Sequence, residues 1–251
     1  MPDLKPGDTV VVTGAAQGIG KAISLELARA GANLDLWDVS TNGCEQTAEE
    51  CRTIGALAIA RTVDVSDTKQ IAQYADQAIK DHRTIFGLVN NAGIFPRVDI
   101  LHTTPEIWQS VLAVNLLGTV FCSQAFAREM AKRKRGCIVN IASGRALQGT
   151  PRGAHYAASK AAIVSFTQSS ALEWAASGIR CNSVIPGVTE TAQPLAECSV
   201  EELRDRGKRI PLGRIGQPDD VAGVTRFLFS AAASFMTGQS VAVNGGSIMI
   251  P

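Results

Sequence analysis

The sequence predicts a single α/β domain built on a doubly wound parallel sheet of seven strands, with helices on both faces. Three observations lead to this prediction. Short β-branched runs alternate with longer amphipathic runs along all 251 residues, which is typical of repeated βαβ units. A glycine-rich turn joins the first strand-like run to a helix-like run. No linker, repeat or low-complexity tract divides residues 1–251, so we expect one domain.

The elements follow one another in regular order. The predicted strands are TVVVT (9–13), NLDLWD (33–38), LAIARTVD (57–64), FGLVN (86–90), GCIVNIA (136–142), IRCNSVI (179–185) and SVAVN (240–244). Helix-like segments lie near 18–30, 42–54, 67–82, 104–134, 155–176 and 218–232. Right-handed crossovers between parallel strands make a doubly wound sheet the simplest topology.

Residues 187–216 break this alternation, because they hold mixed charges, two prolines and no strand-like run. We expect this segment to be a substrate loop, since ligands bind at the carboxyl ends of the strands in such sheets. A pair of surface helices is the alternative.

Composition and charge argue against several classes of function. The net charge is +1, which favours neither nucleic acid nor an anionic membrane surface as a partner. The six cysteines include no C-x-x-C pair and the chain has three histidines, so we expect no metal site and no disulfide framework. The N-terminus does not resemble a signal peptide, and we expect no apolar stretch of the ~20 residues that a membrane span needs. The sequence therefore predicts a cytoplasmic protein with reduced thiols.

The glycine-rich turn TGAAQGIGKA contains Gly14, Gly18 and Gly20, together with Gln17 and Ile19. Glycine permits a tight turn and the close approach of the backbone to a pyrophosphate, and the following helix offers unpaired N–H groups to that anion. Because the turn lies between a strand and an apolar-periodic helix, we expect a Rossmann-like dinucleotide site. A tight turn without a ligand is the alternative.

Asp38 ends the second predicted strand, where an acidic side chain can accept hydrogen bonds from the adenosine ribose hydroxyls. It would also repel a 2′-phosphate, so the sequence predicts NAD rather than NADP; a helix-capping aspartate is the alternative. Asp64 and Val65 end the third strand, and Asn91, Ala92 and Gly93 follow the fourth. We expect both segments to flank the cofactor.

The chain resembles the short-chain dehydrogenase/reductase family over roughly residues 7–246. The motifs that carry the resemblance are TGxxxGxG (13–20), Asp64-Val65, NNAG (90–93), Asn115, Ser143, YxxxK (156–160), PG (186–187) and VNGG (243–246). The resemblance implies a nicotinamide cofactor held additionally by Tyr156, Lys160, Pro186, Gly187, Val188 and Thr189. It also implies a homotetramer, and a water-mediated link from Asn115 to Lys160 for proton relay.

Tyr156 and Lys160 share one face of a predicted helix. A phenol is a poor base at neutral pH, with an ordinary pKa of about 10. A neighbouring ammonium group and a positively charged nicotinamide would lower that pKa, so that Tyr156 can exchange a proton with an alcohol or carbonyl oxygen. Ser143 would hold the same oxygen by a hydrogen bond. A surface helix pair is the alternative for Tyr156 and Lys160 taken alone.

Arg97, Arg145 and Arg152 lie in segments expected to wall the substrate pocket. A guanidinium group suits a carboxylate, sulfonate, phosphate or polyol, so we expect a sugar, polyol or hydroxy acid as substrate. Solvated or interface arginines are the alternative. His155 is expected to be a packed histidine or else a pocket donor.

Two other functions compete with an NAD-dependent dehydrogenase. One is an NADPH-dependent carbonyl reductase, such as a 3-oxoacyl-carrier-protein reductase, for which the basic run 132–135 could be a docking patch. The other is a regulator that binds NAD without catalysis. The sequence does not specify the substrate, the direction of the reaction in the cell, the stereochemistry or the pathway.

Overall fold

The computed structural model describes residues 4–82, 84–191 and 199–249. Seven parallel strands form one sheet in the order β3-β2-β1-β4-β5-β6-β7, which confirms the predicted doubly wound topology. The strands are β1 (Thr9–Thr13), β2 (Asn33–Asp38), β3 (Ala58–Thr62), β4 (Ile85–Asn90), β5 (Gly136–Ile141), β6 (Ile179–Pro186) and β7 (Ser240–Val243). The predicted strands agree with these in number and place.

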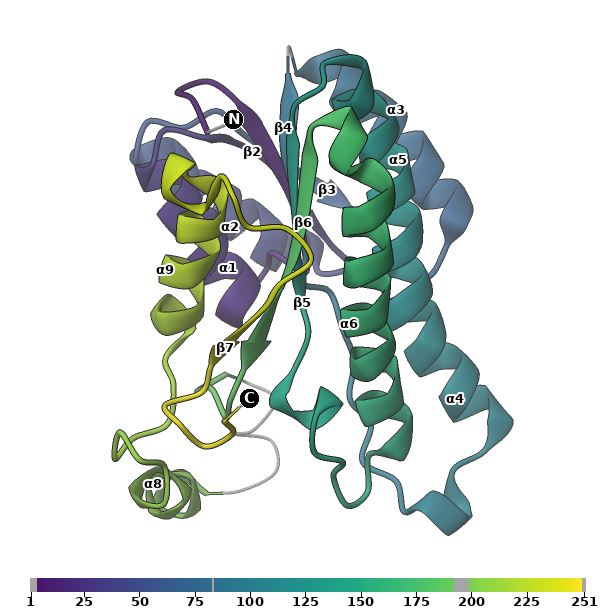
Figure 1. Ribbon diagram of the computed structural model, residues 1–251, viewed down its shortest axis with the longest axis vertical. Helices are drawn as coiled ribbons and strands as arrows, with labels where there is room; N and C mark the ends of the chain where they lie inside the picture. The colour runs from purple at the N-terminus through teal and green to yellow at the C-terminus, as the bar shows by residue number, and fades with distance from the viewer. Residues whose placement is uncertain (1–3, 83, 192–198, 250–251) are drawn as a thin grey trace.

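Helices cover both faces of the sheet (Figure 1). One face is covered by α1 (Gly18–Arg29), α2 (Thr41–Thr53) and α9 (Pro218–Phe229), and the other by α3 (Thr68–Asp81), α5 (Gly118–Lys132) and α6 (Ala154–Trp174). Two apolar cores result, one on each face. The strands are buried from both sides, as the 0% exposure of Val10, Val11 and Val12 shows, which explains their continuous β-branched runs.

The segment predicted as one helix over 104–134 has an irregular centre. A π-helical stretch, Leu112–Leu117, joins α4 (Pro105–Val111) to α5. Contrary to the prediction, the helical run Pro105–Lys132 is long enough, and apolar enough over part of its length, to cross a membrane by length and composition alone. Its side chains Cys122, Phe126 and Met130 are fully buried in the core on the face of the sheet that α3, α5 and α6 cover. This burial accounts for the apolar composition of the helix.

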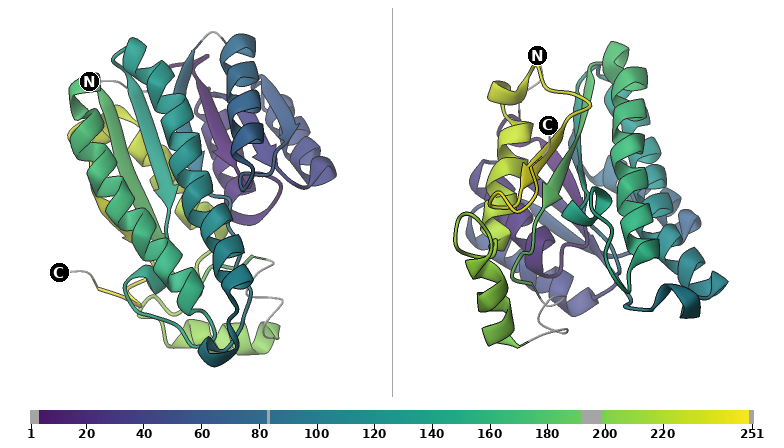
Figure 2. Two further views of the ribbon diagram at one scale, coloured as in Figure 1. Left: turned by 90° about the vertical axis from the view of Figure 1, so that its right-hand side faces the viewer. Right: turned by 60° about the horizontal axis from the view of Figure 1, so that its bottom comes forward.

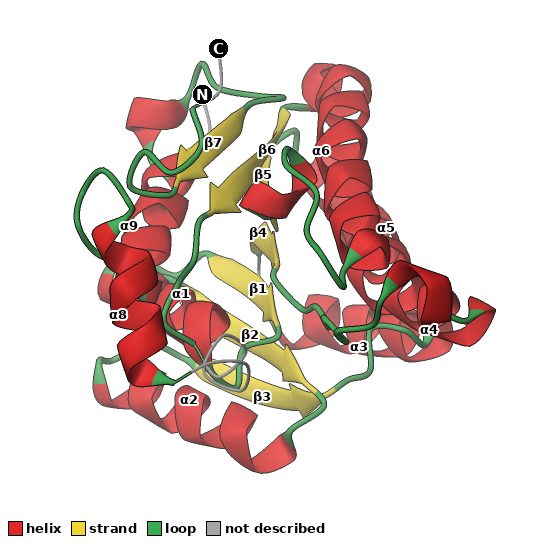
Figure 3. Ribbon diagram, turned by 90° about the horizontal axis from the view of Figure 1, so that it is seen from below, coloured by secondary structure: helices red, strands yellow, loops and turns green. Residues whose placement is uncertain are grey.

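All seven strands end at one edge of the sheet, seen from that side in Figure 3. The helix α8 (Val200–Lys208) lies at this end of the molecule, beyond the sheet layers (Figure 2). It belongs to the predicted substrate loop 187–216, of which residues 192–198 lie outside the described residues. Thr189 and Gly216, near the two ends of this segment, form a parallel β-bridge. In its described part the loop therefore contains one helix instead of a helix pair.

A buried carboxylate on β2 collects an unusual number of donors. Asp35 is 0% exposed and accepts hydrogen bonds from Trp37 Nε1 at 2.6 Å and from Arg61 Nη2 at 2.7 Å. His82 Nε2 lies 2.9 Å from the same carboxylate. The network ties β2 to β3 and to the end of α3, and the ion pair with Arg61 compensates the cost of burying both charges.

We expect Asp35→Asn to lower the free energy of unfolding by about 3 kcal/mol, because the buried guanidinium group of Arg61 loses its buried counter-charge and keeps only the more exposed Asp81, 2.8 Å away. Urea denaturation followed by circular dichroism measures the change. The matched control is Asp76→Asn on the exposed side of α3, which should alter stability by less than about 0.5 kcal/mol. Equal midpoints for the two variants would contradict this account of the network.

Candidate active site

Two adjoining hollows lie at the carboxyl edge of the sheet. The glycine hollow, of about 500 Å³, is lined by Gly14, Gln17, Gly18, Ile19, Trp37, Asp38, Val39, Val63, Asp64, Val65, Asn91, Ala92, Gly93, Ile94, Val114 and Thr191. The tyrosine hollow, of about 290 Å³, contains Ser143, Tyr156 and Lys160 together with Pro186, Gly187, Val188 and Thr189. Ile19, Asn91, Gly93 and Thr191 line both. The two hollows therefore form one continuous site.

The glycine turn has the backbone that the sequence predicts. Gly14 and Gly18 have φ values of +65° and +55°, which side chains rarely adopt. Gly20 lines neither hollow; a Cβ there would collide with the carbonyl oxygen of Gly14, so this glycine is needed for close packing of α1 on the turn. The N-cap Gln17 makes no side-chain hydrogen bond to the helix and the first turn holds no acidic residue. The N–H groups of α1 thus suit an anionic ligand.

Asn91 fixes the turn to the end of β4. Its side-chain amide donates to the carbonyl oxygens of Thr13 and Gly14, at 3.2 and 2.9 Å, while its backbone N–H donates to Thr13 Oγ1 at 3.1 Å. The polar side chains at the strand ends are therefore used to shape the hollow. Ala92 and Gly93, with no bulky side chain, leave space for a ligand beside them.

Asp38 faces the glycine hollow at the end of β2. Its carboxylate accepts hydrogen bonds from Ala16 N–H at 3.0 Å and from Ser40 N–H at 2.9 Å. The N-cap of α2 is Ser40, so the helix-capping interpretation of Asp38 is wrong. A carboxylate has about four lone-pair sites, so acceptor capacity is left for a ligand hydroxyl. Asp64, whose carboxylate binds Ser66 N–H at 2.9 Å, lines the same hollow beside Val65.

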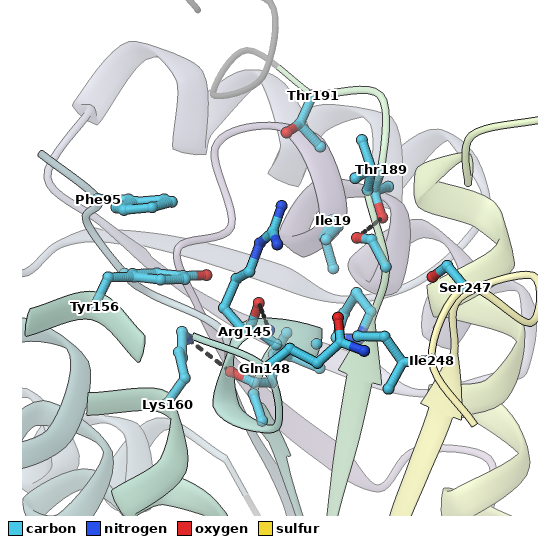
Figure 4. A pocket seen from close by; sticks show the side chains of 18 of the residues that line it. Ile19, Phe95, Arg145, Gln148, Tyr156, Lys160, Thr189, Thr191, Ser247 and Ile248 are labelled. Atoms are coloured by element: carbon cyan, nitrogen blue, oxygen red, sulfur yellow. Dashed lines mark hydrogen bonds between the residues drawn. The ribbon is translucent and has the colours of Figure 1, made fainter. Parts of the chain in front are cut away.

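Ser143, Tyr156 and Lys160 come together in the tyrosine hollow (Figure 4). Ser143 follows β5 and accepts a hydrogen bond from Arg145 N–H at 3.2 Å. Tyr156 lies in the first turn of α6, and Lys160 lies one turn later. The Lys160 ammonium group is 4% exposed and donates to the carbonyl oxygen of Ile141 at 2.7 Å. The interpretation of Tyr156 and Lys160 as a surface pair is therefore wrong.

Burial dominates the titration of both groups. It raises the pKa of Tyr156 above its ordinary value, while the side-chain hydrogen bond with Ser143 and the charges of Arg145 and Arg97 lower it. The pKa of Tyr156 is therefore raised overall, so the predicted lowering of this pKa is not produced by the protein's own groups. Burial also lowers the pKa of Lys160 to about 8. The sequence argument counted the lysine charge and omitted the desolvation that α6 and the sheet impose on both side chains.

Phe95 is a site residue whose role the sequence does not reveal. Its ring stacks on Tyr156 with centroids 4.0 Å apart and planes 11° apart. The guanidinium carbon of Arg97 lies 4.2 Å from the centroid of Phe95. The three side chains form a stack that holds the tyrosine ring flat along one wall of the hollow (Figure 4 shows Phe95 above Tyr156). Only the closeness in sequence of Phe95 to the NNAG motif hinted at it.

Asn115 and His155 are both buried and hydrogen-bonded. The Asn115 side chain is 0% exposed; its oxygen accepts from Ile94 N–H at 2.8 Å and its amide donates to Ser159 Oγ at 3.1 Å. It lines neither hollow, and a Cβ on Gly93 would lie within 3.5 Å of both the Asn115 oxygen and Lys160 Nζ; the water-mediated link between these two side chains stays a prediction. His155 is also buried, with Nε2 2.8 Å from the carbonyl oxygen of Pro96. The packed-histidine interpretation is correct for His155.

The three arginines that were predicted to bind the substrate do not all line the tyrosine hollow. Arg97 and Arg145 line the tyrosine hollow, and Arg152 lies outside it. The predicted substrate loop contributes Thr191 and Arg206, and the tail contributes Ser247 and Ile248, which the sequence did not indicate. Ile248 packs against Gly144, where a Cβ would collide with it. The tail thus helps to form the wall of the chain's own site.

Comparison with known proteins agrees with this geometry. A family model described as enoyl-(acyl carrier protein) reductase matches residues 14–247. A 3-oxoacyl-(acyl-carrier-protein) reductase of Thermotoga maritima is 36% identical over 97% of this chain and 98% of its own length. An L-rhamnose 1-dehydrogenase (NAD(P)(+)) of Azotobacter vinelandii is 39% identical over 95% of both chains. A crystal structure of a candidate NAD(P)-dependent gluconate 5-dehydrogenase from Beutenbergia cavernae, with NADP bound at low occupancy, is 39% identical over 98% of both chains, with a TM-score of 0.92.

The fold and the site are those of an oxidoreductase that acts on CH–OH groups with a nicotinamide dinucleotide. The chain belongs to the short-chain dehydrogenase/reductase family. The resemblance stated from the sequence motifs is confirmed.

The lowered pKa of Lys160 predicts a specific pH dependence of stability. The unfolded chain has the ordinary lysine pKa of 10.5, and the folded protein has one of about 8. Between these values the unfolded state binds more protons, so the wild type gains stability as the pH rises. Below pH 8 Lys160 is charged in both the folded and the unfolded state, so the full cost of burying its charge lowers the stability of the folded protein. We expect Lys160→Met to be more stable than the wild type by about 2 kcal/mol at pH 7, with the difference closing by about pH 10.5.

Urea denaturation at pH 7 and pH 10 measures this difference. Lys69→Met on the exposed side of α3 is the control and should give the same small difference at both pH values. A stability difference for Lys160→Met that does not change with pH would show that the ammonium group is not buried in the charged form.

Proposed function

We propose that this protein transfers a hydride between NAD and a small polar alcohol or carbonyl compound, with Tyr156 as the general acid and base. The observation that carries the proposal is the meeting of Ser143, Tyr156 and Lys160 in a hollow that continues into the glycine hollow. A nicotinamide ring between the two hollows would accept or supply the hydride. The left-handed glycines, the uncapped N–H groups of α1 and the facing Asp38 fit such a dinucleotide.

The chain's own residues account for the proton. The Ser143 hydroxyl would hold the reacting oxygen beside the Tyr156 hydroxyl and thus orient it. In the direction of oxidation, the Tyr156 phenolate takes the proton of the alcohol; in the direction of reduction, the phenol gives a proton to the carbonyl oxygen. The Lys160 Nζ atom, 5.8 Å from the centroid of the tyrosine ring, supplies positive charge that favours the phenolate.

Tyr156→Phe tests this role directly. The variant keeps the ring that stacks on Phe95 and loses only the hydroxyl, so we expect kcat to fall by about 10²- to 10⁴-fold with little change in dinucleotide affinity. The chain's other tyrosine offers a control, because Tyr74→Phe on α3 should leave kcat unchanged. Steady-state rates on a panel of sugars, polyols and hydroxy acids give the answer. A Tyr156→Phe variant with full activity would remove the basis of the proposal.

The preference for NAD is proposed from Asp38. Its carboxylate is suited to ribose hydroxyls and would repel a 2′-phosphate. The structure from Beutenbergia cavernae holds NADP at low occupancy, and the Azotobacter vinelandii relative is named for both cofactors, so the choice depends on residues of this chain. Residues 39–43, VSTNG, include no arginine or lysine that could offset the repulsion between Asp38 and a 2′-phosphate.

We expect NAD to bind at least about tenfold more tightly than NADP, since repulsion of a charged group by Asp38 is worth more than 1.4 kcal/mol. Asp38→Asn should reduce or reverse this ratio while keeping one acceptor oxygen for the backbone N–H groups. Glu45→Gln on α2, which lines neither hollow, is the control and should leave the ratio unchanged. Fluorescence titration with each dinucleotide measures the ratio. Tighter binding of NADP to the wild type would favour the reductase alternative.

The reductase alternative has a specific point in its favour and one against it. The relative from Thermotoga maritima is a 3-oxoacyl-(acyl-carrier-protein) reductase. However, the basic run 132–135 lies just before β5, at the edge of the sheet opposite to Tyr156, and Lys132 and Arg133 pair with Glu129 at 2.9 and 3.3 Å. A carrier protein docked there would not deliver its acyl group to the tyrosine hollow. The run therefore gives this alternative no support.

We also propose that the protein is a cytoplasmic homotetramer without nucleic-acid or membrane partners. Several large apolar side chains are strongly exposed in the single chain, including Leu101, Leu172, Phe235 and Met249, which supports an assembly that covers some of them. The five cysteines that the structure describes are buried and unpaired, which supports a reducing compartment; Cys198 lies outside the described residues. Sedimentation velocity measures the assembly.

A further inference from the structure

A third hollow lies outside the tyrosine hollow and is walled largely by arginines. Its volume is about 740 Å³, and we call it the arginine hollow. Two of its arginines, Arg206 on α8 and Arg209 directly after it, come from the segment 187–216 that the sequence predicted as a substrate loop. Its other arginines come from the loop after β4, the turn after Ser143 and the turn before α6, so that the full set is Arg97, Arg145, Arg152, Arg206 and Arg209.

The arginine hollow and the tyrosine hollow share a wall. Arg97, Arg145 and Arg206 line both of them. Figure 4 shows the Arg145 side chain extending into the space beside the hydroxyl end of Tyr156. A molecule whose hydroxyl group lies at Tyr156 and Ser143 therefore reaches these guanidinium groups with its other end.

No carboxylate compensates this charge inside the hollows. Among the described residues, neither the tyrosine hollow nor the arginine hollow has an Asp or Glu in its lining. Arg145, Arg206 and Arg209 make no side-chain hydrogen bond or ion pair with other residues that the structure describes. Arg152 contacts Asp99 only at 4.0 Å, with both side chains exposed. The concave surface thus carries several like charges that a ligand would have to neutralise.

The fold holds the backbone of these arginines in place, although Arg152, Arg206 and Arg209 are exposed. Arg152 has a φ value of +56°, a strained conformation for a residue with a side chain. Its guanidinium group donates to the carbonyl oxygen of Arg97 at 3.4 Å. Leu203 on α8 and Ile210 just after it are 2% and 8% exposed, and a capping box formed by Ser199 and Glu202 starts the helix. The helix is therefore fixed by burial and capping, and its Arg206 lines the hollow.

Several guanidinium groups around one space suit an oxyanion with two or three oxygen atoms, which can accept paired hydrogen bonds from each fork. A neutral sugar would occupy this space without offsetting the charge. We propose that the substrate is a short secondary alcohol, or its ketone, that carries a terminal carboxylate, sulfonate or phosphate bound in the arginine hollow. This inference rests on the proposed function of Tyr156 and names the substrate class of that site.

An acidic carrier protein is the other ligand that such charges could attract. The arginines line a concave surface that continues into the tyrosine hollow, where the reacting group would lie. A small molecule can occupy both hollows at once, whereas a folded partner would reach only the arginines exposed at the rim. The geometry therefore favours a small molecule.

Matched substrate pairs test the inference. In each pair the neutral alcohol carries a methyl or hydroxyl group in place of the charged group: 3-hydroxybutanoate against 2-butanol, 2-hydroxypropane-1-sulfonate against 1,2-propanediol, and glycerol 3-phosphate against glycerol. We expect kcat/KM for at least one anionic member to exceed that of its neutral partner by at least about tenfold, through KM, and to fall as salt is added. The pair with the largest ratio identifies the oxyanion.

Substitutions in α8 test whether the preference for the anionic substrate comes from the arginine hollow. Arg206→Ala should raise KM for the anionic substrate about tenfold and leave the neutral partner's KM unchanged, and Arg206→Lys should restore part of the loss. Arg204→Ala, on the same helix but outside all three hollows, is the control and should change neither. Equal kinetics for anionic and neutral substrates, insensitive to Arg206→Ala, would overturn the inference while leaving the role of Tyr156 intact.

A binding measurement separates this inference from the proposed function. Calorimetric titration of the NAD-loaded protein with 2-hydroxypropane-1-sulfonate and with glycerol 3-phosphate should show binding that Arg206→Ala weakens, even if no compound is turned over. Turnover confined to 3-oxoacyl thioesters of an acidic carrier protein, without binding of either small anion, would overturn the inference in favour of the carrier.

Discussion

The Asn115 side chain joins three parts of the site that are far apart in sequence. Its oxygen and amide pair with the backbone N–H and carbonyl of Ile94, at 2.8 and 3.1 Å, and the amide also donates to Ser159 Oγ at 3.1 Å. Ser159 Oγ in turn donates to the carbonyl oxygen of Tyr156 at 2.7 Å. The hydrogen bonds of this one buried amide therefore fix the position of the loop after β4 relative to the first turn of α6. Phe95, the next residue of that loop, can then stack on Tyr156.

The π-helical stretch around Asn115 follows from the same requirement. A regular α-helix from Pro105 to Lys132 would place position 115 by its 3.6-residue period alone, whereas the wider turn over Leu112–Leu117 carries Asn115 into the interior between two elements. Such interruptions are frequent at functional sites. Asparagine is tolerated in this apolar segment because all of its hydrogen-bonding groups find partners. The family pattern marked the residue, and the structure shows that it positions the loop and α6 without lining the hollows.

The cofactor side of the site was largely predictable from sequence, and the substrate side was not. Parallel strands end at one edge, so motifs at strand ends must converge; Gly14, Asp38, Asp64 and Asn91 were placed correctly by this rule alone. The loop after β4 and the segment 187–216 were predicted to wall the pocket, but the stacking of Phe95 on Tyr156 and the contributions of Arg206 and Ile248 were not, because these depend on the path of loops, α8 and the tail. No period or strand end fixes those paths. The error for the pKa of Tyr156 has the same origin, since burial is a property of the assembled elements.

This difference between the cofactor side and the substrate side of the site explains how one fold can act on many substrates. The sheet and α1 fix the glycine hollow, and Ser143, Tyr156 and Lys160 are fixed by β5 and α6, so the proton and the dinucleotide are handled in the same way whatever compound enters. The remaining wall comes from segments that lie outside the sheet. Substitutions at their exposed or half-buried side chains cost little stability. In this chain those segments contribute arginines, and the selectivity that we propose for them depends on the charge at the far end of the substrate rather than on the reacting carbon.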